Sequence, residues 1–172
     1  HCLLKRGVSR VICLDVGRGQ LHWDLRRDER VTVMEGYNVR FLGERDLPYT
    51  PDIIVADLSF ISLRLVFAAL HGVLRHGGDL VALVKPQFEA GKGKVGRKGV
   101  VRDPAVHREG LEDVLAAAAR QGFILREVAP SPLSGADGNI EFFAWWRKGE
   151  PAEAVDLDAR VRMALEEAWP AG

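Results

Sequence analysis

Three ionisable side chains lie at the ends of apolar segments or within one in this sequence, where charged groups are unusual. Lys85 directly follows the run LVALV, and Asp57 closes the run DIIVAD. Glu141 interrupts the apolar residues of GNIEFFAWW, and a carboxylate in such a place is costly to bury without a partner. An amine such as that of Lys85 is the nearest suitable partner. If desolvated, a lysine beside two carboxylates could act as a general base.

Two of these three residues, Lys85 and Asp57, also have a plain structural interpretation. Lys85 is followed by Pro86, which ends the strand, so its side chain could simply extend to water from a strand end. Asp57 could cap a helix or form a structural ion pair. The chemical interpretation rests on position, because the carboxyl ends of strands in open α/β sheets face the ligand crevice.

Asp15 closes another apolar run, RVICLD, and is followed by VGRGQ. An acidic residue at the end of the second strand of a nucleotide-binding sheet accepts hydrogen bonds from ribose hydroxyls. The alternative is a helix N-cap. The segment GRG is too short for a phosphate-binding loop, and the chain has no glycine-rich turn before this acid.

The segment 89–103 combines glycines with basic residues. Mobile glycines with cations suit a phosphate backbone that must be gripped without reading its sequence, and a solvated loop is the alternative. The neighbouring tryptophans Trp145 and Trp146 are better explained by packing than by base stacking. The candidate RNA-binding residues are Lys92, Lys94, Arg97, Lys98 and Arg102.

The elements that must position these residues follow an α/β pattern. Short β-branched runs alternate with segments of helical periodicity, which predicts a parallel sheet covered by helices. A helix should begin near Asp103, as the N-cap, with Pro104 at its first position. We predict strands at 10–15, 30–35, 52–57 and 80–84, two closing strands within 123–133 and 139–148, and helices within 20–28 and 62–76.

The bulk properties fit one soluble domain. The chain has 172 residues, of which 47% are hydrophobic, and its 24 basic residues balance its 24 acidic ones. The two cysteines have no metal-binding spacing and indicate a reducing compartment. We find neither an apolar run of membrane-spanning length nor a leader, and expect a cytoplasmic protein without a membrane partner. Because the chain starts with His1 inside what looks like a helix end, we expect a segment upstream of it.

Five stretches together resemble a known family. They are CLDVGRGQLHWDLRRDERV, VMEGYNVR, PDIIVADLSFISLRLV, LVALVKPQFEAGKGKVGRKGVVRDPAVH and PSPLSGADGNIEFF. The sequence is similar to the haemolysin-A-type (TlyA) branch of the FtsJ-like ribosomal RNA methyltransferases over residues 1–148. The resemblance implies a Rossmann-like sheet with helices on both faces, S-adenosylmethionine as cofactor, and 2′-O-methylation of ribose in ribosomal RNA.

The resemblance also assigns roles to residues. Asp57, Lys85 and Glu141 match three members of a Lys-Asp-Lys-Glu catalytic tetrad, and Asp57 also lies toward the cofactor. Asp15 would hold the cofactor ribose, with Glu35 and Asn38 near the adenosine.

Two parts of the family pattern have no counterpart in this chain. The first tetrad lysine and the glycine loop, with the central strand of the sheet, should precede His1. We therefore expect the C-terminal portion of a methyltransferase domain at 1–148, either a fragment or a degenerate enzyme, and an acidic helical tail at 149–172. A non-catalytic module that binds RNA or the ribosomal subunit is the alternative, and a membrane-active toxin is disfavoured because no amphipathic or spanning segment is visible.

Overall fold

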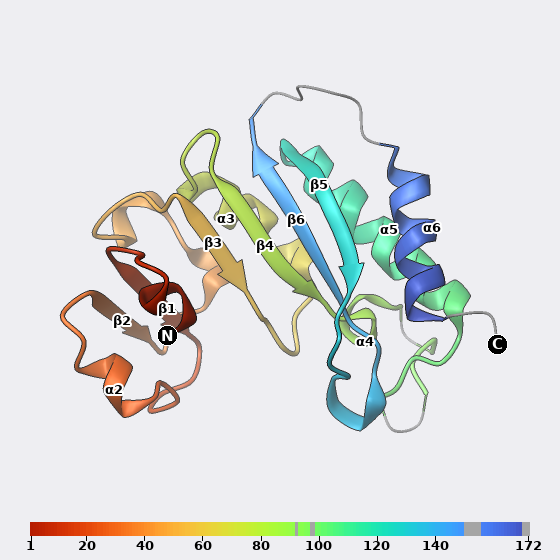
Figure 1. The fold of residues 1–172 in the computed structure, drawn as a ribbon, viewed down its shortest axis with the longest axis horizontal. Coiled ribbons are helices and arrows are strands. Elements are labelled where there is room, and N and C mark those ends of the chain that lie inside the picture. Colours follow the sequence, from red (N-terminus) through yellow and green to blue (C-terminus); the bar gives the residue numbers. More distant parts are fainter. Residues whose placement is uncertain (92, 97–98, 150–155, 170–172) are drawn as a thin grey trace. The chain divides into compact units, whose positions relative to one another are not determined.

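The computed structural model describes residues 1–91, 93–96, 99–149 and 156–169. By its internal contacts the chain divides into two compact units, residues 1–42 and 43–172, which are considered separately (Figure 1). No helix in the described ranges is long and apolar enough to cross a membrane.

The first unit is built on two parallel strands. Their register runs from Val11 opposite Val31 to Asp15 opposite Glu35, so both acidic residues lie at the same edge. The helices of this unit are short, and the helix predicted within 20–28 forms only its four central residues. The elements are α1 (Cys2–Lys5), β1 (Val11–Asp15), α2 (Trp23–Arg26), β2 (Val31–Glu35) and the 3₁₀ turn η1 (Val39–Phe41).

The second unit contains a four-stranded sheet in the order β3-β4-β6-β5. Strands β3 and β4 are parallel, whereas β6 runs antiparallel to both of its neighbours. The elements are η2 (Glu44–Asp46), β3 (Ile53–Ala56), η3 (Leu63–Leu65), α3 (Phe67–Val73), β4 (Asp79–Val84), α4 (Pro86–Glu89), α5 (Pro104–Arg120), β5 (Phe123–Pro130), η4 (Ala136–Gly138), β6 (Phe142–Lys148) and α6 (Leu157–Ala168).

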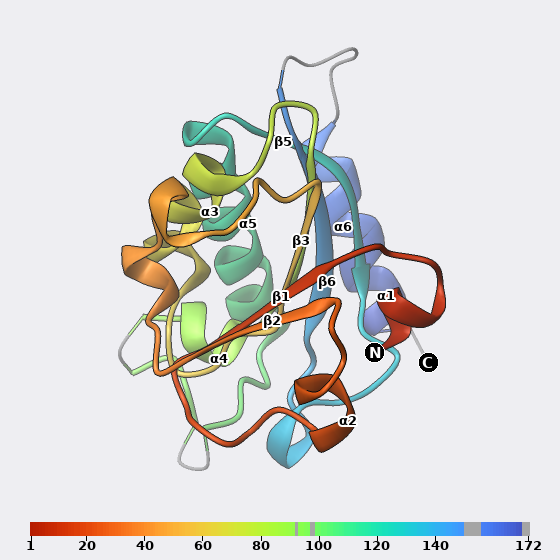
Figure 2. The ribbon, with the colours of Figure 1, turned by 90° about the vertical axis from the view of Figure 1, so that its left-hand side faces the viewer.

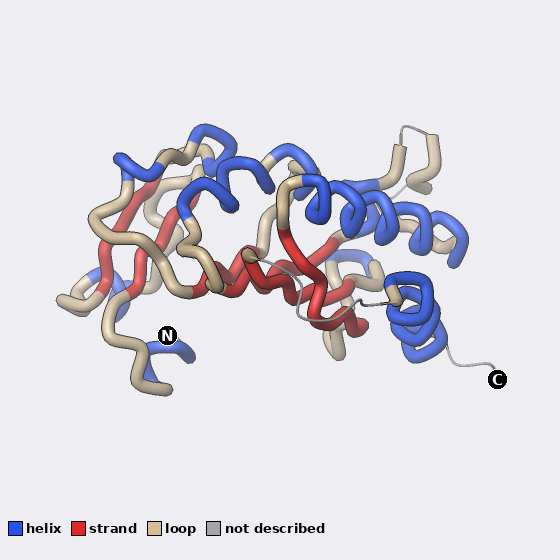
Figure 3. The backbone as a smooth tube through the Cα atoms, turned by 90° about the horizontal axis from the view of Figure 1, so that it is seen from above, coloured by secondary structure: helices blue, strands red, loops and turns tan. Residues whose placement is uncertain are grey.

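Helices α3 and α5 cover one face of this sheet, whereas α6 lies toward the other side and packs along the edge strand β5 (Figures 2 and 3). The second face is therefore only partly covered. Trp146 is 1% exposed, and its ring meets Phe67 of α3 edge-on at 5.5 Å. The preceding residue, Trp145, points to the opposite face and remains 41% exposed. The strict alternation along β6 therefore places one tryptophan in the core and the other at the surface.

The strand β3 is an edge of the sheet and is poorly covered on one face. Ile53 and Val55, which point to the same face, are 40% and 59% exposed. In the described residues, β1 pairs only with β2 and β3 only with β4, so the strands form two sheets.

The longest helix begins where the sequence predicts. Asp103 is the N-cap of α5, its Oδ1 accepts the amide of Ala105 at 2.8 Å, and Pro104 occupies the first helical position. The helix predicted within 62–76 is shorter, because a 3₁₀ turn precedes α3. At the C-terminus α6 packs on β5 and α5 and buries Val161 and Leu165. Its apolar stripe therefore contributes to the core of this unit.

Candidate functional site

The side chains of Lys85 and Asp57 meet at the carboxyl ends of two adjacent parallel strands. Lys85 Nζ lies 2.7 Å from Asp57 Oδ1 and donates a hydrogen bond to Ser59 Oγ at 3.2 Å. The lysine side chain is 13% exposed and that of Asp57 is 69% exposed. The amine is therefore held in place from the protein side, while the carboxylate is accessible to solvent.

Glu141 directly precedes β6 on the same edge of the sheet. The last pair between β4 and β6 joins Val84 to Phe142, so the register brings Lys85 and Glu141 opposite each other one residue further on. The carboxylate partner is nevertheless an amide, because Gln87 Nε2 donates to Glu141 Oε1 at 2.8 Å. The sequence predicted an amine at this position and gave no role to Gln87.

Glu141 also lies directly against the backbone of Gly135. A Cβ atom built on Gly135 would come within 2.3 Å of Glu141 Oε1 and 2.6 Å of its Cδ. Gly135 has φ −71° and ψ −172°, an extended conformation that any residue adopts. This glycine is therefore required by the close approach of the carboxylate and not by its backbone angles.

The short helix α4 carries a second carboxylate, Glu89, whose side chain is only 1% exposed. Its Oε2 accepts from Ser62 Oγ at 2.5 Å, and its Oε1 accepts the amide of Leu63 at 2.8 Å. Burial raises the pKa of Glu89, and the hydrogen bonds from Ser62 and Leu63 oppose that shift. The segment that follows Asp57 is thereby tied to the segment that follows Lys85.

Phe60 is the most unusual backbone position near this site. Its φ is +62°, a left-handed conformation that costs a non-glycine residue roughly 1–2 kcal/mol. The side chain is 92% exposed, and its ring lies 5.3 Å from that of Phe88. No signal in the sequence distinguishes this phenylalanine from a core residue, because LSFISL reads as an ordinary apolar segment.

In the first unit, the predicted cofactor residues Asp15 and Asn38 accept hydrogen bonds from backbone amides two residues further along the chain. Asp15 is exposed and accepts the amide of Gly17 through Oδ1 at 2.7 Å. Asn38 Oδ1 accepts the amide of Arg40 at 3.0 Å and caps η1. The turn after β1 is thus shaped by the acid at its start.

Glu35 makes more contacts than Asp15 at the same edge. Its Oε1 accepts the amide of Gly19 at 3.0 Å and pairs with Arg26 Nη2 at 2.5 Å. The hydrogen bond from Gly19 is the main reason that its pKa is lowered. Glu35 therefore fixes the loop between β1 and α2, and Asp15 is the more accessible of the two carboxylates.

The basic loop is described only in part. Lys92, Arg97 and Lys98 lie outside the described residues. Lys94 Nζ is paired with both carboxylate oxygens of Glu109 on α5, and Arg102 is exposed. The pairing partly neutralises one of the predicted phosphate contacts.

Asn139 holds the end of the basic loop against the turn before Glu141. The residue is 3% exposed, and its Oδ1 accepts the amide of Val101 at 3.1 Å. Its Nδ2 donates to the carbonyls of Gly99 and Ala136 at 3.1 and 3.0 Å. The loop therefore ends at a fixed point two residues from the predicted catalytic carboxylate.

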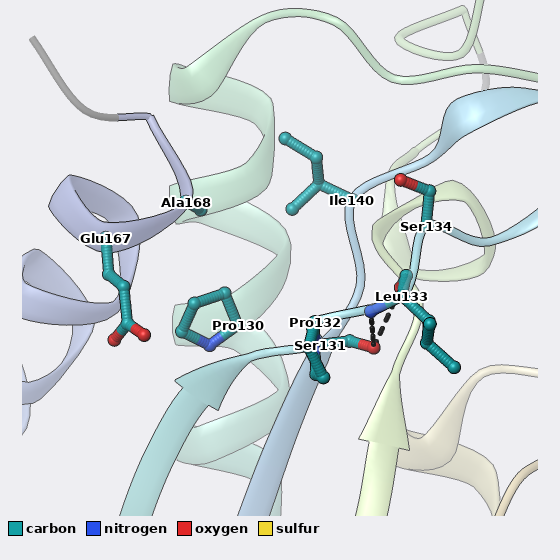
Figure 4. A pocket seen from close by; sticks show the side chains of 8 residues that line it. All are labelled: Pro130, Ser131, Pro132, Leu133, Ser134, Ile140, Glu167 and Ala168. Atoms are coloured by element: carbon teal, nitrogen blue, oxygen red, sulfur yellow. Dashed lines mark hydrogen bonds between the residues drawn. The ribbon is translucent and has the colours of Figure 1, made fainter.

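A cavity of about 390 Å³ lies beside the connection between β5 and β6 (Figure 4). In its wall, Ser131 Oγ donates to the carbonyl of Leu133 and accepts the amide of the same residue, at 2.8 and 3.2 Å. Glu167 of α6 is the one ionisable residue in the lining. The lining contains none of the predicted site residues, so we do not assign the cavity to the site.

The chemistry available to this site is that of amines, carboxylates and amides. Within the described ranges, no group of three or more His, Cys, Asp or Glu residues could hold a metal ion. The arrangement of Lys85, Asp57 and Glu141 suits proton transfer and hydrogen bonding to a hydroxyl group at the sheet edge.

Comparisons with known proteins give a consistent picture. The family described as FtsJ-like methyltransferase matches residues 1–148. The 16S/23S rRNA (cytidine-2'-O)-methyltransferase TlyA of Mycobacterium tuberculosis is 44% identical over 167 residues, which cover 96% of this chain and 62% of that protein. The chain spans about 60% of the length of the curated relatives that it matches.

Solved structures agree with the sequence relatives. A hemolysin from Streptococcus thermophilus has a TM-score of 0.92 at 40% identity, covering 97% of this chain and 60% of its own. The N-methyltransferase NodS from Bradyrhizobium japonicum, solved with S-adenosyl-l-homocysteine, has a TM-score of 0.56 at 17% identity over 82% of this chain and 67% of its own. The latter similarity shows the fold alone.

Proposed function

This chain belongs to the FtsJ-like methyltransferase family, and from that premise we propose that it is part of an S-adenosylmethionine-dependent enzyme that methylates a ribose 2′-oxygen in ribosomal RNA. The observation that carries the proposal is the contact of Lys85 Nζ with Asp57 at 2.7 Å and with Ser59 at 3.2 Å, with Glu141 directly before the adjacent strand β6. We assign the three ionisable residues as the catalytic groups.

In this proposal the amine of Lys85 accepts the proton of the ribose hydroxyl, or weakens the O–H bond by accepting a hydrogen bond from it. Asp57 and Ser59 hold Nζ from two sides, which restricts the amine to one position at the sheet edge. Glu141, directly before the neighbouring strand β6, is assigned to orient the amines of the site. Most of the rate should come from positioning, because a correctly oriented pair of reactants reacts far faster than a free one.

The residues of the first unit suit an adenosine-containing cofactor. Asp15 is exposed at the strand end and uses Oδ1 for Gly17, so its second oxygen remains able to accept from a ribose diol. Asn38 has a further carbonyl lone pair, whereas Glu35 is engaged by Gly19 and Arg26. S-adenosylmethionine, when bound, supplies a methyl group that is already activated as a sulfonium. We therefore assign Asp15 the leading role in holding the ribose.

The remaining assignments follow from the same proposal. We infer that residues 1–148 form the methyltransferase portion, which is supported by the extent of the family match. The basic loop, with Lys94 and Arg102, is assigned to the phosphate backbone of the RNA. Because an enzyme acting on ribosomal RNA works where ribosomes are found, we propose a cytoplasmic location.

The test replaces Lys85 in the full-length protein that contains this chain. Lys85→Ala removes the amine, and Lys85→Arg retains the charge beside Asp57 but cannot lose its proton under ordinary conditions. We expect both variants to lose methyl transfer to ribosomal RNA in a tritiated-methyl assay while their affinity for S-adenosylmethionine, measured by calorimetry, stays near that of the wild type.

A matched control comes from the opposite edge of the sheet. Arg120 is an exposed cation at the C-terminus of α5, next to the start of β5, and Arg120→Ala should leave methyl transfer unchanged. Near-normal turnover by Lys85→Arg would contradict the role of Lys85 as proton acceptor. A wild-type protein that binds ribosomal RNA but not S-adenosylmethionine would instead favour the non-catalytic RNA-binding module.

A further inference from the structure

The four residues that follow Lys85 connect all three segments that carry the predicted catalytic groups. Lys85 is itself the N-cap of α4, and Pro86 occupies its first position. Through Glu89, α4 is hydrogen-bonded to Ser62 and Leu63, a few residues after Asp57. Through Gln87, it is hydrogen-bonded to Glu141.

We propose that Gln87 is the positioning residue for Glu141, supported by a helix that is itself fixed to the segment after Asp57. This inference rests on the function proposed above and extends it to a residue outside the predicted catalytic set. The amide would set the orientation of the Glu141 carboxylate relative to Lys85, without itself touching the RNA or the cofactor.

The orientation of the Gln87 amide follows from its partner. An ionised carboxylate only accepts hydrogen bonds, so the NH₂ group of Gln87 must face Glu141, as it does at 2.8 Å. Its Oε1 is then directed away, and it is buried without a hydrogen-bond partner among the described residues. A buried acceptor without a donor destabilises a fold, so packing alone would favour an apolar side chain at this position. The amide at this position is explained by the hydrogen bond that its nitrogen donates to Glu141.

The helix α4, which carries Gln87, is itself fixed by hydrogen bonds of Glu89. Glu89 is buried and accepts hydrogen bonds from Ser62 and Leu63, and Arg64 Nη2 donates to the carbonyl of Glu89 at 3.0 Å. These bonds fix the C-terminal end of α4, and Lys85 fixes its start in the sheet. The helix that carries Gln87 is thus fixed at both of its ends. The backbone of Gly135 lies against Glu141 on another side.

The experiment uses Gln87→Met in the full-length protein, because methionine has a similar length and no hydrogen-bonding amide. We expect kcat for methyl transfer to fall by about tenfold or more, as a misplaced catalytic group would cause. The KM for ribosomal RNA and the Kd for S-adenosylmethionine should be unchanged. The melting temperature should change little, because the unpaired Oε1 is removed while the buried Glu141 carboxylate loses one hydrogen-bond donor. Wild-type kcat in this folded variant would overturn the proposal.

A double-mutant cycle separates positioning from a general structural role. If Gln87 acts through Glu141, the pair Gln87→Met with Glu141→Gln should be no slower than Glu141→Gln alone. Independent, multiplying losses in kcat would overturn the proposal.

The structure of the Gln87→Met variant provides a readout that does not depend on activity. We expect the Glu141 carboxylate to leave its present orientation, and an unchanged carboxylate would overturn the proposal. An inactive wild type would count against the proposed function, whereas the position of Glu141 in the variant would still decide the role of Gln87.

Discussion

Replacement of Gly135 by alanine should inactivate the protein without unfolding it. The three nearest atoms that an added Cβ would meet all belong to Glu141, the nearest being Oε1 at 2.3 Å. Ordinary van der Waals contact begins at 3.4 Å, so the carboxylate must retreat by about 1 Å. That movement breaks the 2.8 Å hydrogen bond from Gln87. The carboxylate is the end of a flexible side chain, so it moves more readily than the backbone does.

The two effects of Gly135→Ala have different sizes. A displacement of about 1 Å at a catalytic group costs on the order of 100-fold in rate, or about 2.7 kcal/mol of barrier. For stability, the lost hydrogen bond costs about 1 kcal/mol. Alanine can adopt φ −71° without strain, and because it reduces the entropy of the unfolded chain it raises the free energy of unfolding by about 0.4–1 kcal/mol. The melting temperature should therefore change little while kcat falls.

The assay is single-turnover methyl transfer by the full-length protein, with thermal unfolding measured on the same preparations. Gly72→Ala serves as the control, because a Cβ at this helical position in α3 meets no atom within 4 Å. That variant should keep full activity and gain about 0.5–1 kcal/mol of stability. If Gly135→Ala transfers methyl groups within about threefold of the wild-type rate, the argument that Glu141 must stay in place is refuted.

Three further predictions concern stability. Trp146→Ala should lose about 3–5 kcal/mol in urea unfolding because this side chain is 1% exposed, and an equal loss in Trp145→Ala, at 41% exposure, would contradict the alternation along β6. Hydrogen bonds from Arg147 lower the pKa of Asp79, so its stabilising contribution is complete above the ordinary aspartate pKa and is lost as pH falls through the lowered one; this part of the pH dependence of unfolding should disappear in Asp79→Asn. Asn139→Ala leaves the buried amide of Val101 unpaired and should cost about 1–3 kcal/mol, and limited proteolysis should cleave the basic loop faster than in the wild type.

The sequence was sufficient to locate the strands, because each is a short β-branched run between turn residues. It did not predict that β6 runs antiparallel to β4 and β5, where a parallel sheet was expected, because strand direction depends on the path of the connections. The strand predicted at 80–84 is observed at Asp79–Val84, and the N-cap Asp103 is observed where it was predicted. The predicted helices were too long where an apolar periodicity of helical spacing was taken to mark the full length of a helix. The periodic residues of 62–76 are buried as expected, but the chain uses a 3₁₀ turn before α3, and periodicity does not report such a turn.

The candidate site was predictable in its residue types but not in its pairings. The position of Lys85 after an apolar run and of Asp57 at a strand end led to their ion pair, which the structure contains. The partner of Glu141 is Gln87, and this contact depends on the path of four residues after Lys85. Pro86 signals a helix start, but nothing in the local pattern indicates which way a glutamine on it points.

The uncovered edge of β3 has a consequence for the behaviour of these residues in solution. The strand Ile53–Ala56 has the sequence IIVA, without a charge, a proline or a bulge among its four residues. Natural sheets usually protect an edge with one of these devices, because unpaired backbone groups beside apolar side chains are a template for a strand from another molecule. Ile53 and Val55 provide both features at once. Self-association through this edge, and not loss of the internal fold, is therefore the first form of instability that we expect when residues 1–172 are isolated at high concentration.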